Sequence, residues 1–178
     1  MKKQERLQKL ILQLNDKEES VFDKALDDLA ADGDLSIMAP LSEVLFETKI
    51  RSRKTKISAF FSDIEHEPAK IEFMRVMGEL TEDAKQAELL NTIWNSRMDF
   101  SEYLVDFVEL AIDGSFETAI ECHTIIENMD GPFDEADILE CQLLLGTYES
   151  HPKRNKQKDL LIHDIASFLG EMDTEVEG

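Results

Sequence analysis

Residues 22–48 read FDKALDDLAADGDLSIMAPLSEVLFET, two apolar-periodic runs separated by the sequence Asp32-Gly33-Asp34. Apolar residues recur every three or four positions in both runs, at Phe22, Ala25, Leu26, Leu29, Ile37, Leu41, Val44 and Leu45. This spacing places them along one face of an α-helix. Asp-Gly-Asp is typical of a turn, so the stretch predicts two antiparallel helices joined by a short connection.

Similar helical spacing extends from this stretch in both directions and covers the chain. Side chains suited to cap a helix N-terminus recur at Asp16, Asp34 or Ser36, Thr81, Asp99, Ser115 and Asp134. Gly33, Gly114 and Gly131 each follow an apolar run, where a left-handed residue commonly ends a helix. No segment alternates with a period of two for more than a few residues. The chain is therefore predicted to be all-α, with about ten helices in antiparallel pairs.

Two segments resemble a known repeat. The segment Phe22–Thr48, with its Ala-Leu-x-x-Leu helix, its Asp-Gly-Asp turn and the early Pro40 of its second helix, resembles a HEAT-type repeat of the armadillo-type class. Ile57–Leu80 resembles a second copy, with Pro68 at its turn, and a similar rhythm continues to about residue 150. The tetratricopeptide pattern is absent around Trp94, the single tryptophan.

The resemblance implies an α-solenoid, that is, a right-handed stack of antiparallel helical pairs. Residues 1–170 would form a single HEAT-like domain, and residues 171–178 would form an acidic, frayed tail. An irregular helical bundle is the alternative architecture. Since proteins of this class are mostly scaffolds that bind other proteins, the resemblance also implies a non-enzymatic function in protein binding.

Composition excludes several classes of function. The 178 residues hold 19 Lys and Arg against 39 Asp and Glu, a net charge of -20. Phosphate binding needs a basic surface, so neither nucleic acid nor an anionic membrane is an expected partner. Apolar runs of four or five residues are too short to span a bilayer. Two cysteines do not make a secreted disulfide framework, and we expect a cytoplasmic protein.

The acidic residues are concentrated in the second half of the chain. No Lys or Arg occurs between Met98 and Pro152, against 14 acidic residues. On one predicted helix, acidic residues spaced by three or four positions form a stripe, which the next helix continues: Glu102, Asp106, Glu109, Asp113, Glu117 and Glu121. Such a stripe is either a solvated face or a docking surface for a basic protein segment. Three aromatic residues beside it, Phe100, Tyr103 and Phe107, are the candidate apolar contacts.

A basic cluster in the first half is the candidate secondary surface. It consists of Lys49, Arg51, Arg53, Lys54 and Lys56, near the start of one predicted helix. Cations are unfavourable at this end of the helix macrodipole, so an acidic partner could compensate them. The partner of the acidic stripe is accordingly a foreign basic segment or this cluster in a second copy of the chain.

Sequence signals of catalysis and of metal or cofactor binding are weak. The chain lacks nucleotide-binding glycine loops, a serine-nucleophile elbow and an EF-hand acid at the required position. We expect no cofactor, no metal and no catalytic residue. Cys122 and Cys141 lie symmetrically about Gly131-Pro132, so a hairpin of helices near 116–129 and 134–150 would bring them to one interface. They would be two buried apolar side chains, a redox pair, or a metal site with His123.

The favoured hypothesis is a protein-interaction scaffold with an acidic docking surface for a basic partner segment. The alternative is a small helical enzyme or ligand-binding bundle with a carboxylate-lined groove near His123. An enzyme would bring acids with raised pKa values together in a cleft.

Overall fold

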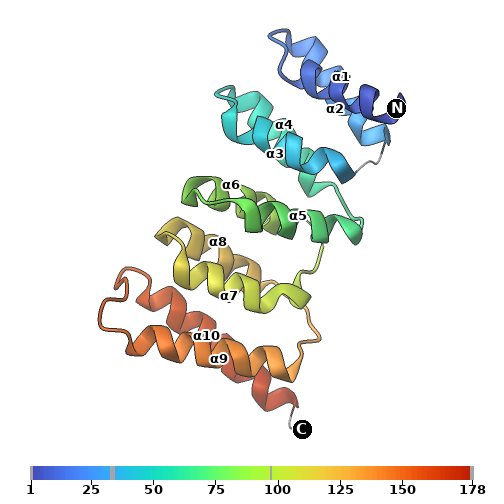
Figure 1. The fold of residues 1–178 in the computed structure, drawn as a ribbon. Helices are drawn as coiled ribbons and strands as arrows, with labels where there is room; N and C mark the ends of the chain where they lie inside the picture. Colours follow the sequence, from blue (N-terminus) through green and yellow to red (C-terminus); the bar gives the residue numbers. More distant parts are fainter. Residues whose placement is uncertain (1, 33–34, 97, 177–178) are drawn as a thin grey trace. The chain divides into compact units, whose positions relative to one another are not determined.

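The structure is a computed structural model, and it describes residues 2–32, 35–96 and 98–176. Ten α-helices and two short 3-10 helices make up its regular structure, and no strand occurs in these ranges (Figure 1). The α-helices are α1 (Lys2–Leu14), α2 (Glu19–Asp32), α3 (Met38–Glu47), α4 (Arg51–Ser62), α5 (Pro68–Glu79), α6 (Asp83–Trp94), α7 (Leu104–Asp113), α8 (Phe116–Glu127), α9 (Glu135–Ser150) and α10 (Asp159–Val176). The 3-10 helix η1 (Leu35–Ile37) precedes α3, and η2 (Ser101–Tyr103) precedes α7. The prediction of an all-α chain with about ten helices is confirmed.

Several helices begin where the sequence predicts. The Ser115 hydroxyl accepts a hydrogen bond from the backbone N–H of Thr118 and caps α8. Asp134 caps α9 by accepting from the N–H of Ala136 at 2.8 Å. Pro68 is the first residue of α5, where its missing N–H leaves no intrahelical bond unmade. The Ser115 and Asp134 side chains satisfy backbone donors that the helix itself cannot pair.

The helix ends agree with the prediction less well. Gly114 follows α7 with φ −76° and ψ −177°, which is extended rather than left-handed backbone. A glycine fits here because a Cβ atom would lie 2.6 Å from the Thr118 side chain. Gly131 does have a positive φ of 75°, but it lies beyond the C-cap of α8, Asn128. Gly33 lies outside the described residues.

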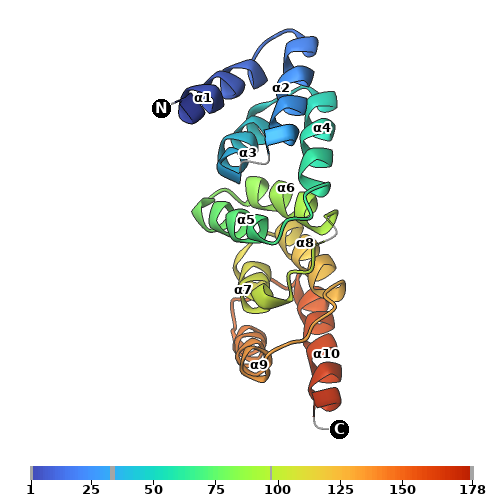
Figure 2. The same ribbon diagram turned by 90° about the vertical axis from the view of Figure 1, so that its right-hand side faces the viewer.

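The chain divides into two compact units, and unit 1 comprises residues 1–80 and 95–98. In unit 1, α1 packs against α2 and α3 packs against α4. One row of helices consists of α1, α3 and α5, in which α3 contacts both α1 and α5. The other row consists of α2 and α4, which contact each other (Figure 2). Edge-to-face packing of Phe61 on Phe73, with ring centroids 5.4 Å apart, joins α4 to α5.

Unit 2 comprises residues 81–94 and 99–178 and also has two rows. α7 and α9 form one row, and α6, α8 and α10 form the other (Figure 2). The antiparallel pairs α7–α8 and α9–α10 connect the rows. Within each unit, the predicted stacking of antiparallel helical pairs is therefore confirmed. The single domain over residues 1–170 stays a prediction.

The hairpin expected between residues 116–129 and 134–150 does not form in the described part of the chain. α8 instead pairs with α7 before it and packs on α6 and α10, while α9 pairs with α10 and packs on α7. The sequence prediction assigned the hairpin to the wrong connection. Gly114 and Ser115 form the short connection between α7 and α8, which pack closely, whereas Gly131-Pro132 lies in the longer link between α8 and α9. Both thiols are buried and free.

The acidic tail expected over residues 171–178 stays a prediction. α10 continues to Val176, and residues 177 and 178 lie outside the described residues. None of the helices in the described ranges has both the length and the apolar composition that a bilayer crossing requires.

Candidate interaction surfaces

The first half of the acidic stripe lies on one row of unit 2. Asp106, Glu109 and Asp113 belong to α7, Glu102 belongs to η2, and all four are exposed. The opposite side of α7 is buried through Leu104, Phe107, Val108 and Ala111, as its apolar spacing predicts. The packing of this apolar side therefore directs the carboxylates to solvent.

The neighbouring helix α9 adds further carboxylates to this row. The pKa of Asp106 is raised, first by partial burial and also by the like charge of Asp137 on α9. Burial raises the pKa of the Cys141 thiol to about 12, and Asp137, Glu140 and Glu109 add to this increase. Carboxylates of α7 and α9 therefore act on the same small region. We call Asp106, Glu109, Asp137 and Glu140 the α7–α9 acidic face.

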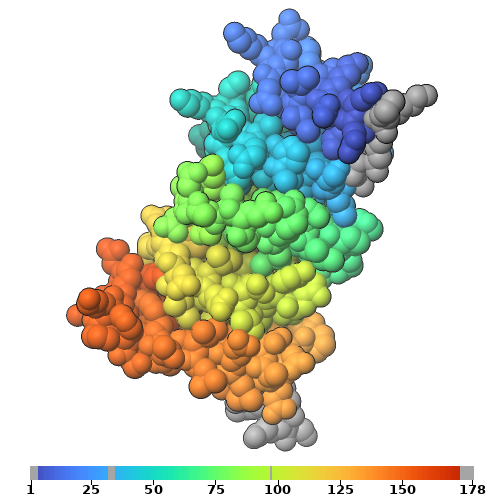
Figure 3. All heavy atoms as spheres, viewed as in Figure 1, coloured from blue at the N-terminus to red at the C-terminus, as the bar shows by residue number. Residues whose placement is uncertain are grey.

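Sequence reasoning missed the α9 half of this face. Asp137 and Glu140 lie three positions apart on one helix, the same spacing that identified the stripe on α7. Their relation to α7 depends on the packing of α7 against α9, two helices that are not consecutive in the chain. Figure 3 views the side of unit 2 on which this row lies, with α7 in yellow-green and α9 in orange.

The second half of the stripe lies on the other row. Glu117 and Glu121 belong to α8, where Glu117 is exposed and Glu121 is half-buried. Both carboxylate oxygens of Glu121 accept from the Asn91 side chain of α6, at 3.3 Å. Burial raises the pKa of Glu121, and these bonds from Asn91 partly offset the increase. Glu121 thus interacts with α6 rather than with the α7–α9 acidic face.

A buried cation lies at the end of α7, the helix that carries Asp113. The side chain of Lys158, 2% exposed as a residue, donates from Nζ to the carbonyl oxygens of Ala111 at 2.9 Å and of Gly114 at 2.8 Å. Burial lowers the pKa of Lys158, and the charges of Asp113 and Asp83 oppose that decrease. A cation that binds the last carbonyl groups of a helix is favoured by the helix dipole.

Two of the three candidate aromatic contacts are core residues. Phe100 and Phe107 are buried, and their rings meet edge to face with centroids 6.0 Å apart. Tyr103 is half-buried, with its ring centroid 6.3 Å from that of Phe100. Of the three, only Tyr103 has side-chain surface that a partner could contact.

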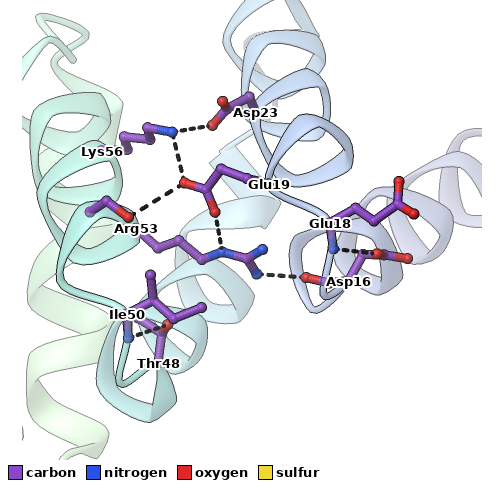
Figure 4. A network of polar contacts seen from close by, with 9 residues as sticks. Asp16, Glu18, Glu19, Asp23, Thr48, Ile50, Arg53 and Lys56 are labelled. Atoms are coloured by element: carbon purple, nitrogen blue, oxygen red, sulfur yellow. Dashed lines mark hydrogen bonds and ion pairs between the residues drawn. The ribbon is translucent and has the colours of Figure 1, made fainter.

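The basic cluster of unit 1 is largely engaged inside that unit (Figure 4). Arg53 is 5% exposed, and its Nε donates to Glu19 at 2.9 Å while Nη1 donates to the Asp16 carbonyl at 2.7 Å. Its guanidinium lies 4.5 Å from the ring centroid of Phe22. Lys56 donates to Glu19 at 2.8 Å and to Asp23.

These contacts join α4 to the start of α2, so Arg53 and Lys56 hold unit 1 together. The pKa of Glu19 is lowered by its bonds from Lys56 and Arg53, and the pKa of Lys56 is raised by Asp23 and Glu19. Lys49 and Arg51 are exposed, and Lys54 is half-buried.

The histidine and cysteine candidates do not assemble into a metal centre. Among the described residues, no three His, Cys, Asp or Glu side chains are grouped as a metal site would require. His123 Nε2 lies 3.4 Å from a carboxylate oxygen of Glu127 and 3.9 Å from one of Asp164. This arrangement places one imidazole near two carboxylates. Burial raises the pKa of the Cys122 thiol strongly. A raised pKa disfavours the thiolate that redox or metal chemistry needs.

Comparison with known proteins gives one structural similarity. No family model matches the chain, and no curated protein matches it in sequence. A designed armadillo repeat protein matches in structure, with a TM-score of 0.45 and 15% sequence identity, over 90% of this chain and 80% of that one.

Proposed function

We propose that this chain is a non-enzymatic protein-interaction scaffold, and that the α7–α9 acidic face of unit 2 docks a basic segment of a partner protein. The observation that carries the proposal is the packing of α7 against α9, which brings Asp106 and Glu109 of one helix into the same row as Asp137 and Glu140 of the other. Like charges brought together on a surface cost stability, and a cationic partner would remove that cost.

The charge difference between the two units supports this assignment. Unit 1 holds 14 basic and 16 acidic residues, whereas unit 2 holds 5 basic and 23 acidic residues. A nearly neutral unit and a strongly anionic unit would attract different surfaces. Such a charge distribution increases association rates with cations and disfavours polyanions such as nucleic acids and anionic membranes. The proposed setting is the cytoplasm.

Apolar side chains on α9 would complement the carboxylates. Leu139 is 49% exposed and Leu143 is 73% exposed, and they lie one turn apart on the helix. Single surface ion pairs contribute about 0–1 kcal/mol, so charge alone gives weak binding. The best partner is therefore an amphipathic segment that presents both cations and apolar side chains.

A foreign segment fits this surface better than the basic cluster of a second copy. Arg53 and Lys56 would have to leave Glu19, Asp23 and the ring of Phe22 before they could bind elsewhere. Lys49 and Arg51 are exposed and lie outside the pairs seen in Figure 4. Self-association through this cluster remains the second partner proposal.

Titration with a defined cationic peptide tests the proposal. The probe is the amphipathic peptide Ac-KLLKKLLKKLLK-amide, and the control peptide has Glu at every Lys position. We expect amide NMR shifts in α7 and α9 with the cationic probe and none with the control. Binding should weaken strongly between about 0.05 M and about 0.5 M salt, because screening shortens the reach of charge interactions. Equal binding of both peptides would contradict the acidic docking surface.

A further inference from the structure

Unit 1 contains a hollow that the α7–α9 acidic face does not involve. Its volume is about 380 Å³, and it is formed by the end of α2, by η1 with the start of α3, and by the end of α4 with the following turn. Pockets that bind ligands commonly begin at about 300 Å³, so this hollow is large enough for one bulky side chain.

The floor and walls of the hollow are apolar. Leu29, Ile37 and Met38 are almost fully buried and come from three consecutive elements, α2, η1 and α3. Phe60 and Ile64 add two half-buried apolar side chains from the end of α4 and the turn after it. An apolar side chain in this space would remove its own surface and the exposed parts of Phe60 and Ile64 from water, which is favourable.

The rim of the hollow is anionic. Asp63 and Glu65 are both exposed and both line the opening, and His66 lies beside them. Among the residues that the structure describes, no Lys or Arg lines the hollow. A ligand with an apolar group and an adjacent positive charge would complement this hollow. Its apolar group would contact the floor, and its positive charge would lie near the carboxylates at the rim.

We infer that this hollow binds a large apolar side chain of a peptide segment in which Lys or Arg is the adjacent residue. The apolar side chain lies on Leu29, Ile37 and Met38, and the neighbouring cation meets Asp63 and Glu65 at the rim. Apolar pockets with a few placed polar groups act in this way, since burial supplies affinity and the charged rim selects the occupant. This site is independent of the proposed function of unit 2.

Methionine methyl NMR tests the inference on the intact chain. The probe peptide is Ac-Lys-Trp-Lys-amide, with Ac-Glu-Trp-Glu-amide and Ac-Lys-Ala-Lys-amide as controls. The Met38 methyl signal, assigned with Met38→Leu, should shift saturably with the probe alone, because the indole ring would lie against it. The Met129 methyl signal of unit 2 should not move and serves as the internal reference. An unmoved Met38 signal, or equal shifts with the two tryptophan peptides, would overturn the inference.

Two neighbouring alanines provide a matched pair of variants. Ala30 and Ala31 are both exposed on α2, but only Ala30 lines the hollow. Ala30→Phe should fill the space and weaken binding of the probe by about tenfold or more, whereas Ala31→Phe should leave it unchanged. The double variant Asp63→Asn with Glu65→Gln keeps the hollow open and should weaken binding by roughly fivefold, in line with two surface charge pairs. Unchanged affinity in Ala30→Phe, or in the double variant, would overturn the inference.

Discussion

The ammonium group of Lys158 donates a 2.8 Å hydrogen bond to the carbonyl oxygen of Gly114, which joins the residue before α10 to the turn between α7 and α8. It donates to the carbonyl oxygen of Ala111 as well, at 2.9 Å. One buried cation therefore holds the last helix of unit 2 against the end of the helix that carries the acidic stripe.

Replacement of Lys158 should destabilise unit 2. Lys158→Met keeps much of the apolar stem but leaves buried carbonyl groups without their donor, at an expected cost of about 2–4 kcal/mol in the free energy of unfolding. Lys156→Met is the matched control, because Lys156 is exposed, and it should change stability by less than about 0.5 kcal/mol. Urea unfolding followed by circular dichroism measures both. Equal stability of the two variants would contradict a structural role for Lys158.

Replacement of Arg53 should destabilise unit 1, as replacement of Lys158 should destabilise unit 2. Arg53→Met should lower the free energy of unfolding by about 2–3 kcal/mol, because it removes two charged hydrogen bonds at a largely buried position. Arg51→Met, at an exposed position two residues away, should be nearly neutral. If both variants unfold at the same urea concentration, the network of Figure 4 does not hold α2 to α4.

Asp106 should make stability depend on pH. Its folded-state pKa is raised, so the folded protein binds more protons than the unfolded chain between the unfolded and folded pKa values. Stability therefore falls as pH rises through this window, and the loss persists at neutral pH. Asp106→Asn should remove this dependence and raise stability at pH 7 by up to about 1 kcal/mol. Thermal unfolding from acidic to neutral pH measures it, and a steeper fall in the variant would refute the assignment.

The two cysteines should be protected in the folded protein. Cys122 and Cys141 are fully buried, and burial raises both thiol pKa values, that of Cys141 to about 12. Since the thiolate is the reactive form, a thiol reagent such as Ellman's reagent should label neither cysteine at pH 8 until the protein is unfolded. Rapid labelling of either thiol in the native protein would show that unit 2 opens locally.

Helix formation was predictable from the sequence because it depends on local spacing and capping. The residues Leu104, Phe107 and Ala111 are all buried, as expected from their spacing of three or four positions on one face of a helix. Asp134 and Ser115 capped their helices for the same local reason.

Interactions between separate helices were not predictable in this way. Arg53 is buried by Glu19 and Phe22, which lie more than one helix away in the sequence. Asp137 joins Asp106 only because α9 packs on α7, and Lys158 binds Gly114 across 44 residues. Periodicity assigns a residue to a face of its helix, but it does not identify the helix that covers that face. The charge stripe was therefore recognised on α7 and missed on α9.

The association rate of Ac-KLLKKLLKKLLK-amide tests most directly whether the α7–α9 acidic face docks a basic segment. Stopped-flow measurement at low salt should compare Glu109→Lys with Asp137→Lys in one variant against Asp130→Lys with Glu149→Lys in a second. Both variants change the net charge equally, but Asp130 and Glu149 are exposed positions outside the face. We predict that the first variant slows association by about tenfold or more and the second far less, since local charge steers the encounter. Equal slowing in both variants, with helicity intact, would show that only the net charge of unit 2 acts and would contradict the account.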